Sequence, residues 1–324
     1  MKQKLVSVAL AALILMFSSS TPAQQSKVYQ IGVLLPAGPL TGVVDGLKEG
    51  LRELGLEQGK QYTLKIRDTK NEVKATEEEA RNFEQEKFNL IYALTTAAII
   101  AAKGATTNIP IVFAIGSDPV AAGLVDSFAK PGGRLTGVHF LVRDLSAKRL
   151  EILKEILPRL GRVVTFYDPS SRVAADGAAL AREEAKRLGL KLVERHVITA
   201  DELRTSLYAL KSGEADAFLF SPDPRVGGQA QLIIDAAKAK KLPTMFHEQS
   251  LVTKGALASY GQNYNEIGRL SAKYVQRVLS GTDPRNLKIE TVENVELAIN
   301  LKTAKALGLT IPPNVLARAN NVIR

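Results

Sequence analysis

Cysteine is absent from this 324-residue chain. Without a thiol there is no disulfide, no cysteine nucleophile and no thiolate metal site. The cysteine that follows the signal sequence of a bacterial lipoprotein is missing too. A chain of about 300 residues is long enough to bury one large or two medium hydrophobic cores without cross-links. We therefore expect the fold to be held together by burial alone.

Long hydrophobic runs are also scarce, and the longest lies at the start of the chain. Residues 5–17 are apolar, Lys2 and Lys4 precede them, and small residues follow as far as Thr21-Pro22-Ala23. The run is shorter than the ~20 residues of a membrane span and has the order of a removable secretion signal. We expect residues 1–23 to be a signal peptide, and the mature protein to be soluble, not lipidated and periplasmic.

Charge of one sign is nowhere concentrated. The net charge is +10, which becomes +8 without Lys2 and Lys4, and basic residues are interleaved with acidic ones in stretches such as 77–87 and 182–187. The densest basic cluster, 238–241, lies at an expected helix end, where cations complement the helix dipole. This pattern indicates a solvated surface, and we expect no nucleic-acid partner.

The local signatures of common enzymes are missing as well. The three histidines are far apart, and the chain has no HExxH, GxSxG or GxxxxGK[ST] motif, nor a GxGxxG motif after its first strand. We expect that the protein is not an enzyme and that it binds neither a cofactor nor a metal ion. An enzyme acting in a cleft remains an alternative that would need an acid–base pair in contact.

What the chain does contain is a pattern that occurs twice. Residues 89–116 and 217–250 each read as a short apolar strand, a polar loop, an alanine-rich helix and a second strand. The second strand opens with Ile109-Pro110 in one copy and Leu242-Pro243 in the other. One βαβ unit in each half predicts two similar α/β lobes. A cleft between such lobes indicates ligand capture.

The flanking segments extend this alternation of strands and helices. The predicted strands are 28–35, 61–68, 135–141, 162–167 and 191–197, and the predicted helices are 42–55, 72–88, 144–158, 173–189, 201–212 and 266–279. Each half then fits an α/β fold with a doubly wound parallel sheet in flavodoxin-like order, its first strand in the middle. Alternating polarity places 61–68 near a sheet edge. A strand and helix over 295–308 have Asn300 as N-cap.

We expect the chain to cross between the lobes more than once. Lobe one is expected to contain 24–141 and about 251–289, and lobe two 142–250 and about 290–324. Several crossovers would form a multi-strand hinge.

In open α/β sheets, ligands lie beyond the carboxyl ends of the strands. The loops expected there are rich in Ser, Thr and Asp, residues that also serve as ordinary helix N-caps. Tyr167 and Tyr260 suit either a pocket wall or the core. The candidate ligand-binding residues are Thr95, Thr96, Ala97, Ser117, Asp118, Tyr167, Ser221, Asp223, Glu248 and Tyr260.

Six blocks of sequence then point to one family. They are residues 46–59, 108–120, 123–138, 148–158, 255–261 and 300–312, including SDPV, KPGG and NLKTAKALG. With them the chain resembles the tryptophan/tyrosine-binding-like ABC-transporter substrate-binding proteins, which have a type I periplasmic-binding-protein fold. The resemblance implies an amino-acid receptor whose contacts come from loops matching 95–97, 117–118, 221–223 and Tyr260. The loop at 36–39 is shorter than the family's usual loop.

These expectations combine into one functional hypothesis. The lobes close over a small solute, an amino acid or similar small organic carboxylate, and present it to an ABC permease in the inner membrane. Asp118 suits an ammonium group, and helix N–H groups suit a carboxylate. We expect a monomer. The alternative is a periplasmic ligand-sensing module that serves a signalling receptor.

Overall fold

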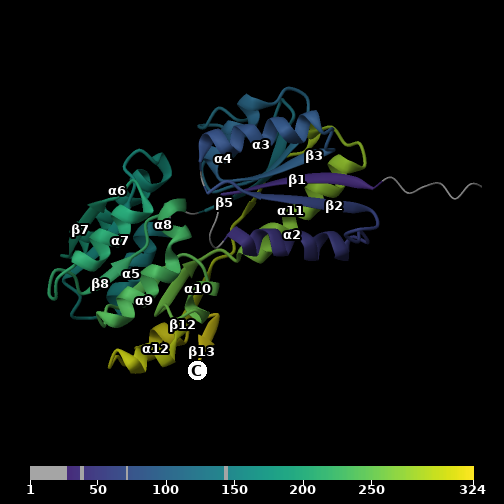
Figure 1. Ribbon diagram of the computed structural model, residues 1–324. Helices are drawn as coiled ribbons and strands as arrows, with labels where there is room; N and C mark the ends of the chain where they lie inside the picture. Colours follow the sequence, from purple (N-terminus) through teal and green to yellow (C-terminus); the bar gives the residue numbers. More distant parts are fainter. Residues whose placement is uncertain (1–27, 37–39, 71, 142–144) are drawn as a thin grey trace, which may run out of the picture.

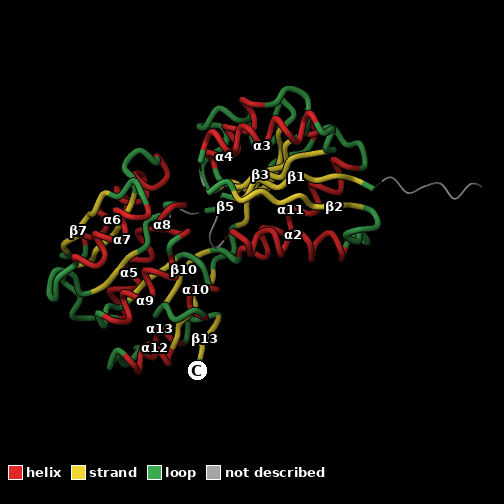
Figure 2. Tube along the Cα trace, viewed as in Figure 1, coloured by secondary structure: helices red, strands yellow, loops and turns green. Residues whose placement is uncertain are grey.

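The computed structural model describes residues 28–36, 40–70, 72–141 and 145–324. The expected signal peptide, residues 1–23, and most of the short loop at 36–39 lie outside the described residues. Figures 1 and 2 show two lobes, each with a sheet sandwiched between helices. Among the described residues, no helix has the length and apolar character that crossing a membrane requires.

Lobe one is defined by a six-stranded sheet in the order β11-β5-β4-β3-β1-β2, parallel throughout. The predicted flavodoxin-like order is confirmed, and β2 is an edge strand as its alternation indicated. Its elements are β1 (Tyr29–Leu35), α2 (Thr41–Glu53), β2 (Tyr62–Asp68), α3 (Val73–Gln85), β3 (Leu90–Leu94), α4 (Thr96–Ala105), β4 (Ile111–Ile115), β5 (Leu135–Phe140), α11 (Tyr264–Leu279), the 3-10 helix η3 (Pro284–Asn286) and β11 (Glu290–Val292).

The core of lobe one lies on both faces of this sheet. Strands β3 and β4 are buried along their whole length, as expected of apolar runs inside a parallel sheet. Helices α3 and α4 cover one face, and α2 and α11 cover the other (Figure 1). Glycines let α2 and α11 approach closely: a Cβ on Gly268 would lie 2.0 Å from the Val43 carbonyl oxygen.

Lobe two is defined by a seven-stranded sheet in the order β13-β12-β10-β9-β8-β6-β7. The pair β10–β12 is antiparallel, and the other pairs are parallel. Its elements are α5 (Ser146–Ile156), β6 (Arg162–Tyr167), α6 (Arg172–Arg187), β7 (Lys191–His196), α7 (Ala200–Ala209), β8 (Ala217–Leu219), α8 (Pro224–Gly228), α9 (Ala230–Ala239), β9 (Thr244–Phe246), α10 (Ser250–Thr253), β10 (Ala258–Gly261), β12 (Glu296–Asn300), α12 (Leu301–Ala306), α13 (Pro313–Leu316) and β13 (Asn321–Ile323).

The chain passes between the lobes three times: between β5 and α5, between β10 and α11, and between β11 and β12. Two expected boundaries need correction. The stretch 251–261, expected in lobe one, contains β10, which pairs with β9 in lobe two. Strand β11, expected in lobe two, pairs with β5 in lobe one. These strands have four and three residues, too few for a readable period.

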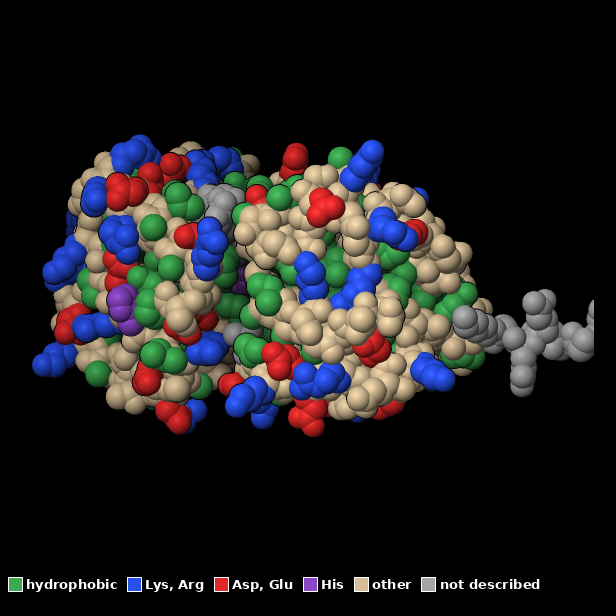
Figure 3. Space-filling model, turned by 90° about the horizontal axis from the view of Figure 1, so that it is seen from above, with side chains coloured by type: hydrophobic (Ala, Val, Ile, Leu, Met, Phe, Trp, Pro, Cys, Tyr) green, Lys and Arg blue, Asp and Glu red, His purple; other side chains and the backbone are tan. Residues whose placement is uncertain are grey.

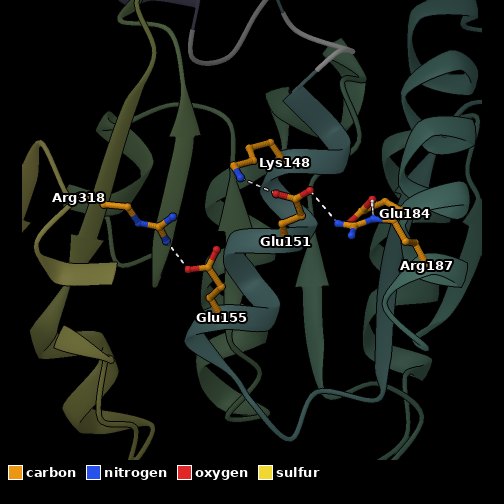
Figure 4. A network of polar contacts seen from close by, with 6 residues as sticks. All are labelled: Lys148, Glu151, Glu155, Glu184, Arg187 and Arg318. Carbon is orange, nitrogen blue, oxygen red and sulfur yellow. Dashed lines mark hydrogen bonds and ion pairs between the residues drawn. The ribbon is translucent and has the colours of Figure 1, made fainter. Parts of the chain in front are cut away.

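The C-terminal segment is held on lobe two. Asn300 caps α12 as predicted, because its side chain accepts a hydrogen bond from the Thr303 N–H. Figure 4 shows Glu155 of α5 paired with Arg318. On the same helix, Glu151 pairs with Lys148 and with Arg187 of α6. These ion pairs link α5 to α6 and to the C-terminal segment, while buried side chains of α5 pack into the lobe-two core.

Candidate ligand-binding site

A cavity of about 460 Å³ lies between the two lobes, at the carboxyl ends of their strands. Lobe one contributes the loops after β3 and β4, and lobe two contributes the loops after β6, β8 and β9. The volume is in the range that encloses one small organic molecule. Figure 3 shows hydrophobic side chains along the seam between the lobes, with acidic and basic side chains mixed over both.

The lobe-one wall is built around the start of helix α4. The hydroxyls of Thr96 and Ser117 lie 2.6 Å apart and join the loops after β3 and β4. Thr96 and Ala97 form the first turn of α4, where backbone N–H groups have no partner within the helix. This turn therefore offers donors and a partial positive charge to an anion.

Thr95 stands at the same point in a strained backbone conformation. Its φ of 76° is uncommon for a β-branched residue. Its buried hydroxyl makes no hydrogen bond with any residue of the described chain, although Thr95 lines the cavity. Strain and an unpartnered hydroxyl at one residue are features that cluster at ligand sites.

Asp118 adds a negative charge to this wall. One of its oxygens, Oδ1, accepts hydrogen bonds from the N–H groups of Val120 and Ala121, at 2.8 and 3.2 Å. These bonds fix the turn after β4 and hold the carboxylate at the cavity edge. A helix start with free N–H donors and a carboxylate thus lie on the same lobe.

The lobe-two wall carries a charged cluster with its own internal bonds. Asp223 accepts hydrogen bonds from the N–H groups of Asp168, at 2.7 Å, and Arg225, at 2.8 Å. Arg225 in turn forms an ion pair of 2.9 Å with Asp168. Burial raises the pKa of Asp223. Both Asp223 oxygens serve the protein itself, so this residue shapes the wall.

The floor of the cavity is aromatic. The His247 ring stacks on Phe220, with centroids 3.9 Å apart, and lies 5.7 Å from the Tyr264 ring. Phe140 follows at 6.0 Å from Tyr264. Behind the floor, the buried Arg149 donates from Nε to the Tyr260 carbonyl oxygen at 2.7 Å. Burial lowers the pKa of Arg149 to about 10, which leaves it charged at neutral pH.

The structure brings together six of the ten candidate residues. The cavity lining includes Thr95, Thr96, Ala97, Ser117, Asp118 and Asp223. The other four lie outside that lining. The Tyr167 hydroxyl donates to Glu194 at 2.6 Å, and the Ser221 hydroxyl to the Ala174 carbonyl at 3.1 Å.

The remaining two candidates serve lobe two as well. Glu248 accepts a hydrogen bond of 2.9 Å from the Ser250 N–H at the start of α10. Tyr260 packs its ring against the lobe-two core. Both side chains therefore contact other residues of lobe two.

The sequence did not predict most of the aromatic floor. Nor did it predict the ion pair that Arg225 forms with Asp168 in the cavity lining. Phe220 is both buried and part of the lining, so its apolar character alone does not separate a core role from a cavity role. His247 belongs to a loop that the strand pattern does place at the cleft, so its position was readable. Tyr264 is the first residue of α11, which returns from lobe two, and no local signal carries that placement.

The chain belongs to the family of ABC transporter substrate binding proteins, whose model matches residues 30–323. The predicted family and its type I periplasmic-binding-protein fold are thereby confirmed. It is a family of binding proteins.

Three relatives show the extent of this similarity. A tyrosine-binding protein from Clostridioides difficile (strain R20291) is 28% identical over 296 residues, which cover 90% of this chain and 84% of that protein. A conserved domain protein from Vibrio cholerae O1 biovar El Tor strain N16961 is 30% identical, with a TM-score of 0.81. The match covers 92% of this chain and 99% of that one. An ABC domain from Streptococcus pneumoniae in complex with L-Trp is 24% identical, with a TM-score of 0.82. That match covers 92% of this chain and 100% of the other.

Proposed function

We propose that this chain is the extracytoplasmic receptor of an ABC importer and that it captures an amino acid by closing its lobes. Residues 1–23 would direct export to the periplasm. There the mature monomer, neither lipidated nor bound to nucleic acid, would deliver its ligand chemically unchanged to a permease in the inner membrane. The family supports the transport role, and relatives named for tyrosine and solved with tryptophan support the ligand class.

The observation that carries this proposal is the pairing of opposite charges on the lobe-one wall. The first turn of α4, with Thr95 and Ser117 beside it, suits a carboxylate. Asp118 suits an ammonium group. A zwitterion therefore meets a complementary partner at each end of its head group. The aromatic floor leaves an apolar compartment for the side chain.

Closure would follow from contacts that the ligand makes with both lobes. The cavity has walls from each lobe, and the chain passes between them three times. A ligand that favours the closed form by ~3 kcal/mol shifts the equilibrium more than a hundredfold. The closed surface would be what the permease recognises.

Substitution of Asp118 tests the head-group assignment. Asp118→Asn keeps the oxygen that accepts the Val120 and Ala121 N–H bonds but removes the charge. We expect the affinity for aromatic L-amino acids, measured by titration calorimetry, to fall about tenfold or more, because a charge-assisted hydrogen bond contributes ~1.5–3 kcal/mol. The corresponding amino-acid amides and N-acetyl derivatives should bind weakly to the unaltered protein. Unchanged affinity in Asp118→Asn would remove Asp118 from the site.

A further inference from the structure

His247 is a buried polar residue that the protein itself leaves without a hydrogen-bond partner. It follows β9 directly, its exposed fraction is 5%, and it lines the cavity. Its Nδ1 atom makes no hydrogen bond with any described residue. Buried polar atoms in native proteins nearly always have a partner, so an orphan on a residue that lines a cavity needs an explanation. A group on the ligand would supply one.

The surroundings of the imidazole ring are aromatic and tightly fixed. Phe220 stacks on one face, with an angle of 18° between the rings, and Tyr264 lies at an angle of 60°. The end of β10 presses on the His247 backbone, since a Cβ on Gly261 would lie 1.9 Å from the His247 carbonyl oxygen. The ring is therefore a positioned polar group held beside two aromatic rings.

The chemistry of the ring follows from its burial. Burial and the charge of Arg149 hold the pKa of His247 well below its ordinary value. The side chain is neutral at physiological pH and offers one N–H donor and one nitrogen acceptor. A neutral imidazole makes directional hydrogen bonds with a hydroxyl or a ring N–H, and it does not attract an anion.

We infer that His247 is the residue that determines side-chain specificity in this cavity, selecting an aromatic amino acid whose ring carries a hydroxyl or N–H group. This inference rests on the proposed function, because the head group must occupy the lobe-one wall for the ring to reach the floor. A phenyl ring would fill the same space and leave the imidazole unpartnered. Sites built to bond a polar group discriminate strongly against the analogue that lacks it.

The test compares matched ligand pairs by titration calorimetry. The pairs are L-tyrosine with L-phenylalanine, and L-tryptophan with 1-methyl-L-tryptophan. We expect the unaltered protein to prefer the first member of at least one pair by about tenfold or more. In His247→Phe, which keeps an aromatic ring against Phe220, that ratio should fall to within about threefold. The affinity for the second member should be retained.

Each other outcome has a defined meaning. If the unaltered protein binds all four ligands without discrimination, or if His247→Phe weakens both members of a pair equally, His247 only shapes the cavity and the inference is wrong. If the unaltered protein binds none of them, the proposed function fails first. His196→Phe, at an exposed histidine outside the cavity lining, is the matched control and should leave every ratio unchanged. His247→Leu, which also removes the polar group, serves where His247→Phe does not fold, and it is read by the same ratios.

Discussion

At the scale of single residues, the polar groups of the cavity fall into two kinds. Asp223 and Asp168 have their hydrogen bonds completed by the protein, while the Thr95 hydroxyl and His247 Nδ1 find no partner among the described residues. An unmade hydrogen bond at a buried group costs ~1–3 kcal/mol. Groups of the first kind shape the cavity, and under the proposed function groups of the second kind would find their partner on the ligand.

The buried His247 makes stability depend on pH. Its pKa in the folded protein is held well below the ordinary value by burial and by Arg149, so the unfolded chain binds the proton first as pH falls. The contribution of His247 to the free energy of unfolding is therefore fully present above about pH 6.5, and it declines as the pH falls below that value. From about pH 7.5 to pH 5.5, the unaltered protein should lose more of its unfolding free energy than His247→Phe loses, because only the unaltered protein has a buried imidazole that must stay neutral when folded.

Urea unfolding at the two pH values measures this difference. Both proteins carry the same other titrating groups, so His247→Phe subtracts their common contribution. Equal losses in the two proteins would mean that His247 is protonated as readily when folded as when unfolded. The groups that face its ring, Phe220, Tyr264 and Arg149, would then not exclude its charged form.

The sequence predicted where the site lies better than it predicted which candidate side chains line the cavity. The loops after the strands do meet at one cavity, and Thr95, Ser117 and Asp118 line it. Ser221 and Glu248 satisfy the same rule, yet their side chains bond to the protein. Sequence cannot separate these cases, because a hydroxyl or carboxylate after a strand serves as a cap or a ligand contact according to its rotamer and neighbours.

At the scale of elements, the packing of α2 against α11 positions one part of the cavity. A Cβ on Gly46 would lie 2.0 Å from the Asn265 carbonyl oxygen, and one on Gly268 would lie as close to that of Val43. Tyr264, at the start of α11, reaches the cavity floor from this helix pair. The close approach thus sets the position of a cavity residue.

Gly268→Ala should therefore reduce both stability and binding. The added methyl group meets backbone, which cannot rotate away, so α11 must move from α2 at a cost of ~1–3 kcal/mol. Tyr264 moves with α11, and ligand affinity should fall with it. Thermal unfolding and calorimetry measure the two effects.

Gly104→Ala provides the matched control. Gly104 lies on an exposed face of α4, and a Cβ there would have nothing within 4 Å. Alanine in a helix is favoured over glycine by ~0.5–1 kcal/mol, so this variant should be slightly more stable. If Gly268→Ala behaved like Gly104→Ala, the close approach of the two helices would not constrain either one.

Among the elements, a local pattern decided what sequence could predict. Even β8 and β9, with three residues each, were predicted as parts of the repeated strand–helix–strand unit. Strands of five to seven residues such as β1, β2 and β6 have periods or apolar runs that predict them, and β6 agrees at both ends. Strands β10, β11 and β13 have three or four residues each and were not predicted. Their pairing is set by partners distant in sequence, which a local pattern does not contain.

At the scale of the whole molecule, the lobes are joined by three connections. The three passages, after β5, β10 and β11, are short compared with the lobes that they join. Each lobe has its own hydrophobic clusters, so the lobes can move as bodies while their cores stay intact. Motion of this kind is the usual way in which two-lobed binding proteins enclose a ligand.

The absence of cysteine allows this motion to be measured directly. Lys74 on α3 and Glu183 on α6 are exposed residues on different lobes, and neither lines the cavity. Spin labels on a Lys74→Cys, Glu183→Cys variant would report the distance between the lobes by pulsed electron paramagnetic resonance. We expect a saturating aromatic amino acid to shift the distance distribution to shorter values, because the ligand gains contacts with both walls only when they approach.

The same labelled protein carrying Asp118→Asn separates closure from binding. At a ligand concentration that saturates the labelled protein but not this variant, the variant should have a smaller population at the short distance. At a higher ligand concentration it should recover the full shift. A distribution that stays the same while calorimetry records binding would show that the lobes already hold their ligand-bound arrangement. The receptor would then present the same lobe arrangement to a permease with and without ligand, and recognition of the loaded form could not depend on closure.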